Sequence, residues 1–143
     1  NVQDLVNTAW AFAKLGHLDA ALFIAVARSI TGRCLDGLNA PHIANIAWAF
    51  AKAGQLDVQL FSALARSAEH RVSEFNAQEL VSIAWAFANA GQLDAQLFSS
   101  LASSIENFLD DFNDEELDNA EWAFAQCAGQ QRIVKCLRQR RKG

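Results

Sequence analysis

The sequence is built on a short string, Ala-Trp-Ala-Phe-Ala, that returns at a nearly constant interval. It occupies 9–13, 47–51 and 84–88, and a variant that begins with glutamate occupies 121–125. The four tryptophans are therefore spaced by 38, 37 and 37 residues: Trp10, Trp48, Trp85 and Trp122. A period of roughly 20–50 residues is typical of arrays in which each unit buries its apolar face against its neighbours. The sequence predicts an all-α fold, a solenoid of about four helix-turn-helix repeats with a period of 37–38 residues.

The period also predicts the repeat boundaries within one continuous domain. Repeat 1 spans 1–38, repeat 2 spans 39–75, repeat 3 spans 76–112 and repeat 4 spans 113–143. Repeat 4 departs from the pattern, because it lacks the Leu-Asp pair before its second helix and that helix, 132–142, is basic. We therefore expect repeat 4 to be a C-terminal cap with a basic tail.

Each repeat carries the start and stop signals of a helical hairpin, which are clearest in repeat 3. Asn76 and Glu79 have the spacing of a capping box, so the first helix is predicted from 77 to about 90. Gly91 ends this helix and Asp94 caps the second one after a turn of about three residues. The equivalent stops and caps in the earlier copies are Gly16, Gly54, Asp19 and Asp57.

Hydrophobic staples are expected before both helices of a repeat. Those of the first helices pair Leu38 with Ile43, Phe75 with Leu80, and Phe112 with Leu117. Those of the second helices pair Leu18 with Phe23, Leu56 with Phe61, and Leu93 with Phe98. Pro41 falls in the first turn of its helix, where a missing N–H does no harm.

Composition narrows the class of protein. Apolar residues make up 52% of the chain, which argues against disorder, and no apolar run is long enough for a membrane span. The three cysteines form no C-x-x-C pair, and no histidine stands at ligand spacing to them, so we expect a reducing compartment, no metal and no cofactor. The chain shows no secretory signal and begins inside a repeat without Met, as a piece of a longer protein would.

Charge is unevenly distributed although the net charge is only −4. Residues 106–121 hold eight acids and no base, which we interpret as a solvated acidic face rather than a cation site. The C-terminal segment holds six bases and no acid: Arg132, Lys135, Arg138, Arg140, Arg141 and Lys142. These side chains are candidates for contacts with phosphates.

The repeat resembles a known family. A helix start of the form N-x-[QE]-[DE]-L, followed by AWAFA-x-x-G-x-L-D across the turn, is similar to the octotricopeptide repeat and to the helical repeats of proteins that carry RAP domains. The resemblance implies an α-solenoid of algal or protist organelles, the chloroplast or the mitochondrion. It also implies action on organellar RNA in transcript processing, stability, splicing or translation, or a place as a ribosome-associated subunit.

Three columns of side chains on the polar face of the first helices are candidate RNA contacts. One holds Asn7, Asn45, Ser82 and Asn119; the second holds Gln3, Pro41, Gln78 and Glu115; the third holds Lys14, Lys52, Asn89 and Gln126. Amides and hydroxyls can read base edges and the lysines can meet phosphates, although an ordinary solvated face would have the same composition. The tryptophans could stack on bases, but we favour packing between repeats.

No catalytic motif and no phosphate-binding loop is present in the sequence, so we predict a protein that is not an enzyme and has no small-molecule substrate. The leading hypothesis is an RNA-binding helical-repeat protein of organellar gene expression, with single-stranded RNA as its partner. The alternative is a scaffold or structural subunit that binds protein partners in a large assembly. The acidic net charge and the small size favour this alternative.

Overall fold

The computed structural model describes residues 1–17 and 19–142, and within them the side chains of all residues except 33–35 and 142. This part of the chain is all-helical and contains no strand. Eight α-helices follow one another in pairs: α1 (Val2–Lys14) with α2 (Ala20–Ser29), α3 (Ala40–Ala53) with α4 (Val58–His70), α5 (Ala77–Asn89) with α6 (Ala95–Glu106), and α7 (Asp114–Ala125) with α8 (Gln131–Lys142). The predicted all-α class is confirmed.

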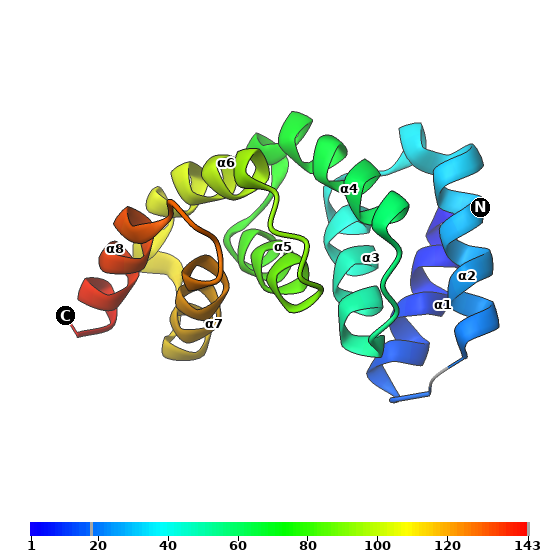
Figure 1. Ribbon diagram of the computed structural model, residues 1–143, viewed down its shortest axis with the longest axis horizontal. Coiled ribbons are helices and arrows are strands. Elements are labelled where there is room, and N and C mark those ends of the chain that lie inside the picture. Colours follow the sequence, from blue (N-terminus) through cyan, green and yellow to red (C-terminus); the bar gives the residue numbers. More distant parts are fainter. Residues whose placement is uncertain (18, 143) are drawn as a thin grey trace.

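Helices in equivalent positions pack side by side. The first helices of the pairs contact one another in chain order, α1 with α3, α3 with α5, and α5 with α7. Among the second helices, α4 contacts α6 and α6 contacts α8. Figure 1 shows the pairs following one another along the molecule, with the two termini at opposite ends.

The helix ends obey the local signals of the sequence. The side chains of Asn39, Asn76 and Asn113 each cap a first helix in a capping box, and Asp19, Asp57 and Asp94 each cap a second helix. Gly54 adopts a left-handed conformation with φ 69°, as do the equivalent glycines. A side chain with a Cβ would be strained there, which explains why glycine stands at the end of the first helix in the first three pairs.

The predicted staples are confirmed by burial only at the first helices. Leu38, Phe75 and Phe112 are buried, as are their partners. At the second helices Leu56 and Leu93 remain 56% and 41% exposed, so burial does not confirm the predicted staples there. These leucines lie in the short turn between helices, on the outside of the molecule, and Leu18 lies outside the described residues.

Edge-to-face phenylalanine pairs join successive hairpins through the core. In each pair, a phenylalanine on the second helix of one repeat meets one on the first helix of the next repeat. The ring centroids of Phe23 and Phe50 are 5.0 Å apart, those of Phe61 and Phe87 5.0 Å, and those of Phe98 and Phe124 5.3 Å. All six rings are at most 1% exposed. We call these contacts the inter-repeat phenylalanine pairs.

Repeat 1 holds its additional residue in the connection to repeat 2. There the chain forms a π-helical turn (Ile30–Cys34) followed by a 3-10 turn (Leu35–Gly37). The later connections each have one 3-10 turn instead, Val72–Glu74 and Leu109–Asp111. The extra residue is therefore accommodated outside the paired α-helices.

Candidate binding groove

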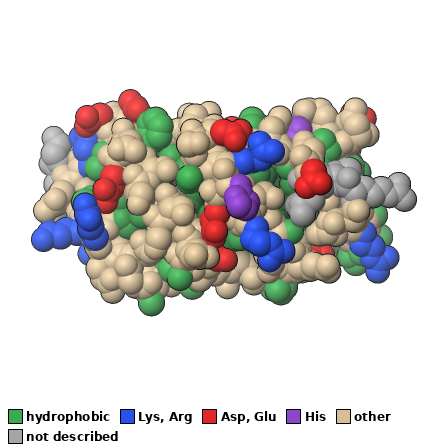
Figure 2. Space-filling model, turned by 90° about the horizontal axis from the view of Figure 1, so that it is seen from above, with side chains coloured by type: hydrophobic (Ala, Val, Ile, Leu, Met, Phe, Trp, Pro, Cys, Tyr) green, Lys and Arg blue, Asp and Glu red, His purple; other side chains and the backbone are tan. Residues whose placement is uncertain are grey.

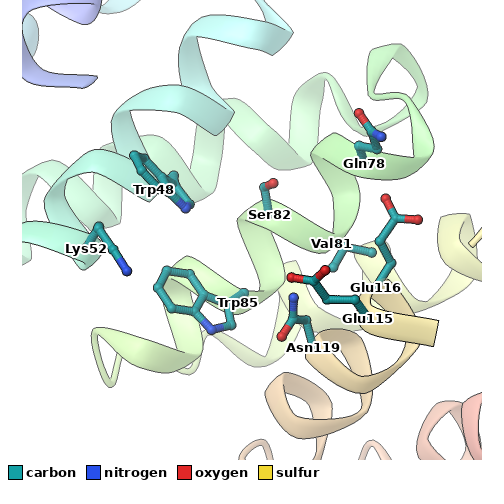
Figure 3. A pocket seen from close by; sticks show the side chains of 9 residues that line it. All are labelled: Trp48, Lys52, Gln78, Val81, Ser82, Trp85, Glu115, Glu116 and Asn119. Atoms are coloured by element: carbon teal, nitrogen blue, oxygen red, sulfur yellow. The ribbon is translucent and has the colours of Figure 1, made fainter. Parts of the chain in front are cut away.

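A hollow of about 430 Å³ opens on the surface formed by the first helices of successive hairpins (Figure 3). We call the exposed side of α1, α3, α5 and α7 the A surface. Side chains from three neighbouring helices line the hollow: Trp48, Lys52, Gln78, Val81, Ser82, Trp85, Glu115, Glu116 and Asn119.

The tryptophans are part of this surface as well as part of the packing. Trp48 and Trp85 are half-buried against the core, in agreement with the expected packing, but both also line the hollow. Trp10 and Trp122 are 37% and 43% exposed. The rings of Trp10 and Trp48 lie 6.2 Å apart between centroids and are tilted by 37°. The tryptophans therefore contribute to the A surface as well as to the interior packing. They do so because their position lies one residue away from the apolar stripe of the helix.

The structure brings together candidates from all three predicted columns. Ser82 and Asn119, Gln78 and Glu115, and Lys52 line the same hollow. Asn7 and Asn45 lie at the equivalent positions of α1 and α3 and are exposed, and so is Pro41 in the first turn of α3. The hollow therefore presents amide, hydroxyl, carboxylate and ammonium groups around two indole rings.

Four amides of the predicted columns already have partners within the protein, one of them being Asn7, whose Oδ1 accepts from Gln3 Nε2 at 3.4 Å. Gln3 Oε1 lies 2.9 Å from His42 Nε2, and because His42 Nδ1 accepts from the Asn39 N–H, Nε2 donates this bond. The Asn89 side chain donates to the carbonyl of Ala51 at 3.2 Å. Gln126 donates to a carbonyl one turn earlier in its own helix. These groups hold neighbouring helices or a helix end in place, a role that the sequence pattern did not reveal.

Two lysines supply the positive charge of the A surface. The ammonium of Lys14 lies 4.6 Å from the centroid of the Trp10 ring, within range of a cation–π contact. Lys52, the equivalent residue of α3, is exposed and lines the hollow beside Trp48. An anionic group that binds here would meet a lysine next to an aromatic ring.

Carboxylates stand on the opposite side of the hollow, on α7. Glu115 is exposed, whereas Glu116 accepts a hydrogen bond from the Asn113 N–H at 3.0 Å in a capping box. Glu116 was not among the predicted site residues. The spacing of Glu116 from Asn113 indicates a capping box. The same capping box holds the Glu116 side chain at this edge of the hollow.

The acidic and basic runs near the C-terminus face each other. Arg138 pairs with Glu121 at 2.8 Å, and Arg141 pairs with Asp118 and with Glu121, the latter at 2.9 Å. The hydrogen bond to Asp118 raises the pKa of the Arg141 guanidinium. Two further pairs join Arg140 to Asp110 at 3.1 Å and Arg132 to Glu106 at 3.5 Å. We call these contacts the C-terminal arginine network.

This network changes the interpretation of both charge runs. The acidic run is not simply a solvated face, because four of its carboxylates are paired with α8. Conversely, four of the six bases proposed to meet phosphates are engaged with carboxylates of the same chain. Lys135 is exposed and lines a second hollow, of about 510 Å³, beside Cys127, and the side chain of Lys142 lies outside the described part. Figure 2, a view over α4 and α6, shows blue and red side chains interspersed rather than a broad area of one sign.

Comparison with known proteins assigns no family to the chain. No protein-family model matches it, and a search of curated proteins finds no significant match. Within residues 1–17 and 19–142, no three His, Cys, Asp or Glu side chains are grouped so that they could hold a metal ion. In the same part of the chain no helix combines the length and the apolar character needed to cross a bilayer.

Proposed function

We propose that this chain is a non-enzymatic α-solenoid that binds single-stranded RNA along the A surface. The observation that carries the proposal is the placement of four tryptophans at equivalent positions of four helices, two of them lining a hollow with amides, a hydroxyl and Lys52, and a third, Trp10, lying beside Lys14. Proteins that bind single strands combine aromatic stacking with a groove that tracks the backbone. The A surface offers indole rings for stacking and a hollow with Lys52 in its lining, which supports the proposal.

Side-by-side packing of equivalent helices supports the solenoid part of the proposal. Each first helix contacts the next one along the chain, and each inter-repeat phenylalanine pair joins consecutive hairpins. In such an array, equivalent positions form a row, so that one row can offer one contact per repeat to an extended ligand. The four predicted repeats would then present four indole rings in succession.

Stacking would supply most of the affinity. Each base stacked on an aromatic ring contributes about 1–3 kcal/mol, without strong preference among bases. Side chains such as Asn45 and Ser82 can both donate to and accept from base edges, which would add preference. We therefore expect Asn45→Ala to change the preferred base and to leave the fold intact.

Electrostatics predicts weak and only moderately salt-dependent binding. Lys14 and Lys52 are the lysines placed on the A surface, whereas the arginines of α8 are engaged in the C-terminal arginine network. Each phosphate neutralised on a single strand contributes about −0.7 to the slope of log affinity against log salt. Two phosphates would give a slope of about −1.4. Because Arg138 is already paired, we expect Arg138→Ala to weaken binding less than Lys52→Ala.

Tryptophan fluorescence tests the proposal directly, because all four tryptophans of the chain lie at equivalent positions of the first helices. Short single-stranded RNAs are titrated at low salt, and quenching should saturate. Lys52→Ala should weaken binding, whereas Arg66→Ala should not, although both remove one positive charge. Arg66 is exposed on α4, a second helix. Absence of saturable quenching, or equal effects of the two substitutions, would reject RNA binding at the A surface.

A protein-binding scaffold is the second candidate, and one observation favours it. Glu115 and Glu116 stand at the edge of a hollow that also holds two indole rings, a combination that suits a basic side chain of a peptide. In this case Lys- or Arg-rich peptides, and not RNA, would quench the tryptophans, and Glu115→Gln would weaken the effect. RNA binding with no peptide binding would reject the scaffold.

The organellar role belongs to the same proposal and is supported by the likeness of the repeat to octotricopeptide repeats. We propose that the chain acts in transcript processing, stability or translation in a chloroplast or mitochondrion. Crosslinking in the native organelle, followed by sequencing of the bound RNA, would test this role separately from the binding measurement in solution.

A further inference from the structure

The outer face of the first hairpin carries apolar residues that are covered in every later hairpin. Leu5, Phe12 and Leu22 are only half-buried. The residues at the same positions of the later hairpins are at most 3% exposed: Ile43, Leu80 and Leu117; Phe50, Phe87 and Phe124; Leu60 and Leu97. In those hairpins the preceding hairpin supplies the cover. We call this outer side of α1 and α2 the N-terminal face.

Phe12 shows most directly what is missing from this face. Each later phenylalanine at this position, which we call the acceptor ring, packs edge-to-face with a phenylalanine of the preceding second helix, which we call the donor ring, as Phe87 does with Phe61. Phe12 instead contacts His17 of its own hairpin, with 5.3 Å between ring centroids. The acceptor half of an inter-repeat phenylalanine pair is therefore present without the donor half.

Leu15 is a further apolar residue of the N-terminal face, and it is 81% exposed. The equivalent residues, Ala53 and Ala90, line crevices against the preceding hairpin, with volumes of about 110 and 170 Å³. A leucine has the bulk to fill a crevice that an alanine leaves open. This exposed leucine thus suits a face that another hairpin covers.

The opposite end of the array is built differently. Where repeat 3 has the buried Val81, repeat 4 has the exposed Asp118, which pairs with Arg141. Where repeat 3 has Phe98, the donor of an inter-repeat phenylalanine pair, repeat 4 has the exposed Lys135. This end offers charge and no donor ring, so another copy of this chain cannot complete the N-terminal face by stacking head to tail.

We propose that the N-terminal face is a docking surface for one further helical hairpin of the same type. That hairpin carries a phenylalanine on its second helix, and this ring packs edge-on against Phe12. The occupant is a repeat with the packing chemistry of repeats 2 and 3. The inference depends on the contacts between successive hairpins and stands whether or not the A surface binds RNA.

The register of the sequence allows a clean test. Asn1 caps α1 as Asn76 caps α5, and Phe75 precedes Asn76. A copy of residues 39–75 placed directly before Asn1 therefore recreates a natural junction between repeats. In this extended chain, the added copy of Phe61 falls opposite Phe12, as the original Phe61 falls opposite Phe87.

Hydrogen exchange followed by mass spectrometry measures whether the added hairpin docks. We expect amide exchange in α1 to slow by about tenfold or more, because docking raises the cost of local opening. The matched control carries Phe61→Ala in the added copy only and should lose most of this protection. Phe12→Ala in the extended chain should lose it as well.

Three results would overturn the proposal. The first is unchanged exchange in α1 of the extended chain, including the case in which the added hairpin does not fold. The second is equal protection by the hairpin with and without Phe61→Ala, which would mean that no ring-specific contact forms. The third is a dimer of the original chain, seen by light scattering and dissociated by Phe12→Ala, which would make a second copy the occupant.

Discussion

Removal of one ring from the middle of the array tests how the hairpins are held together. Phe61 is 1% exposed, and its ring meets that of Phe87 at 5.0 Å and 80°. Truncation of a buried phenylalanine to alanine costs about 3–5 kcal/mol, because apolar contact is lost and a cavity remains. About 0.5–1.5 kcal/mol of this cost belongs to the edge-to-face geometry of the aromatic pair. We therefore expect Phe61→Ala to destabilise the protein by about 3–5 kcal/mol.

The loss would be a large part of the total stability. A folded chain of 143 residues has an unfolding free energy of about 7–21 kcal/mol at 0.05–0.15 kcal/mol per residue. Urea denaturation followed by far-ultraviolet circular dichroism and by tryptophan fluorescence measures the change. Two probes are needed because a repeat array can unfold in parts. Coincident transitions with an unchanged slope would allow the two free energies to be compared.

Phe12→Ala is the control, since it removes a phenylalanine from the repeat position that Phe87 occupies, at a place where no phenylalanine partner is in contact. Phe12 is half-buried, so its truncation should cost less than about 2 kcal/mol. The double variant of Phe61 and Phe87 should show a coupling of about 0.5–1.5 kcal/mol. Equal losses from Phe61→Ala and Phe12→Ala would refute the reasoning, because the paired ring would then contribute nothing beyond its own helix.

Three further predictions concern side chains outside the phenylalanine pairs. Glu121→Gln weakens the C-terminal arginine network, so it should lower the unfolding free energy by up to about 1 kcal/mol at low salt and by much less at 1 M salt. If the variant and the original protein differed in unfolding free energy by the same amount at both salt concentrations, the contribution would not be ionic. Burial, and secondarily Asp94, raises the pKa of the Cys127 thiol, so at pH 8 Cys127 should be alkylated more slowly than Cys136, and its rate of alkylation should continue to rise at higher pH. Mass spectrometry of the separate peptides measures the two rates, and equal rates would contradict the prediction. Asn89→Ala removes a hydrogen bond between neighbouring hairpins and should cost about 0.5–1.5 kcal/mol in urea denaturation, whereas Gln96→Ala, at an exposed glutamine of α6, should cost almost nothing.

Local signals in the sequence predicted the helices well. Caps such as Asn76 and stops such as Gly54 act within a few residues of the helix end that they determine, so the sequence alone contains the interaction. The exposure of Leu56 was not predicted, because the staple pattern also describes only residues close to the helix end. The pattern of residues was right, but the short turn leaves this leucine at the surface, which depends on the way the hairpin packs.

Contacts between repeats were beyond the reach of the sequence pattern. The pairing of Arg140 with Asp110 joins residues 30 positions apart, and the bond of Gln3 to His42 joins residues 39 positions apart. Such partners are determined by how the hairpins stack, which the sequence pattern does not show. For this reason the acidic run and the basic run were interpreted as two independent features. The tryptophan period indicated equivalent positions in the four repeats and we favoured packing for them, but a position one step off the apolar stripe is compatible with both burial and exposure.

The unequal length of the repeats has a consequence for how such a surface can diversify. The additional residue of repeat 1 is confined to the π-helical and 3-10 turns between Ile30 and Gly37, after the second helix, and every tryptophan still occupies the same place in its own helix. Chain length can vary at these connections without disturbing the spacing of groups that face a ligand. Insertions there would be tolerated, whereas a single residue added within α3 would rotate Trp48 by about 100° around the helix axis and interrupt the row.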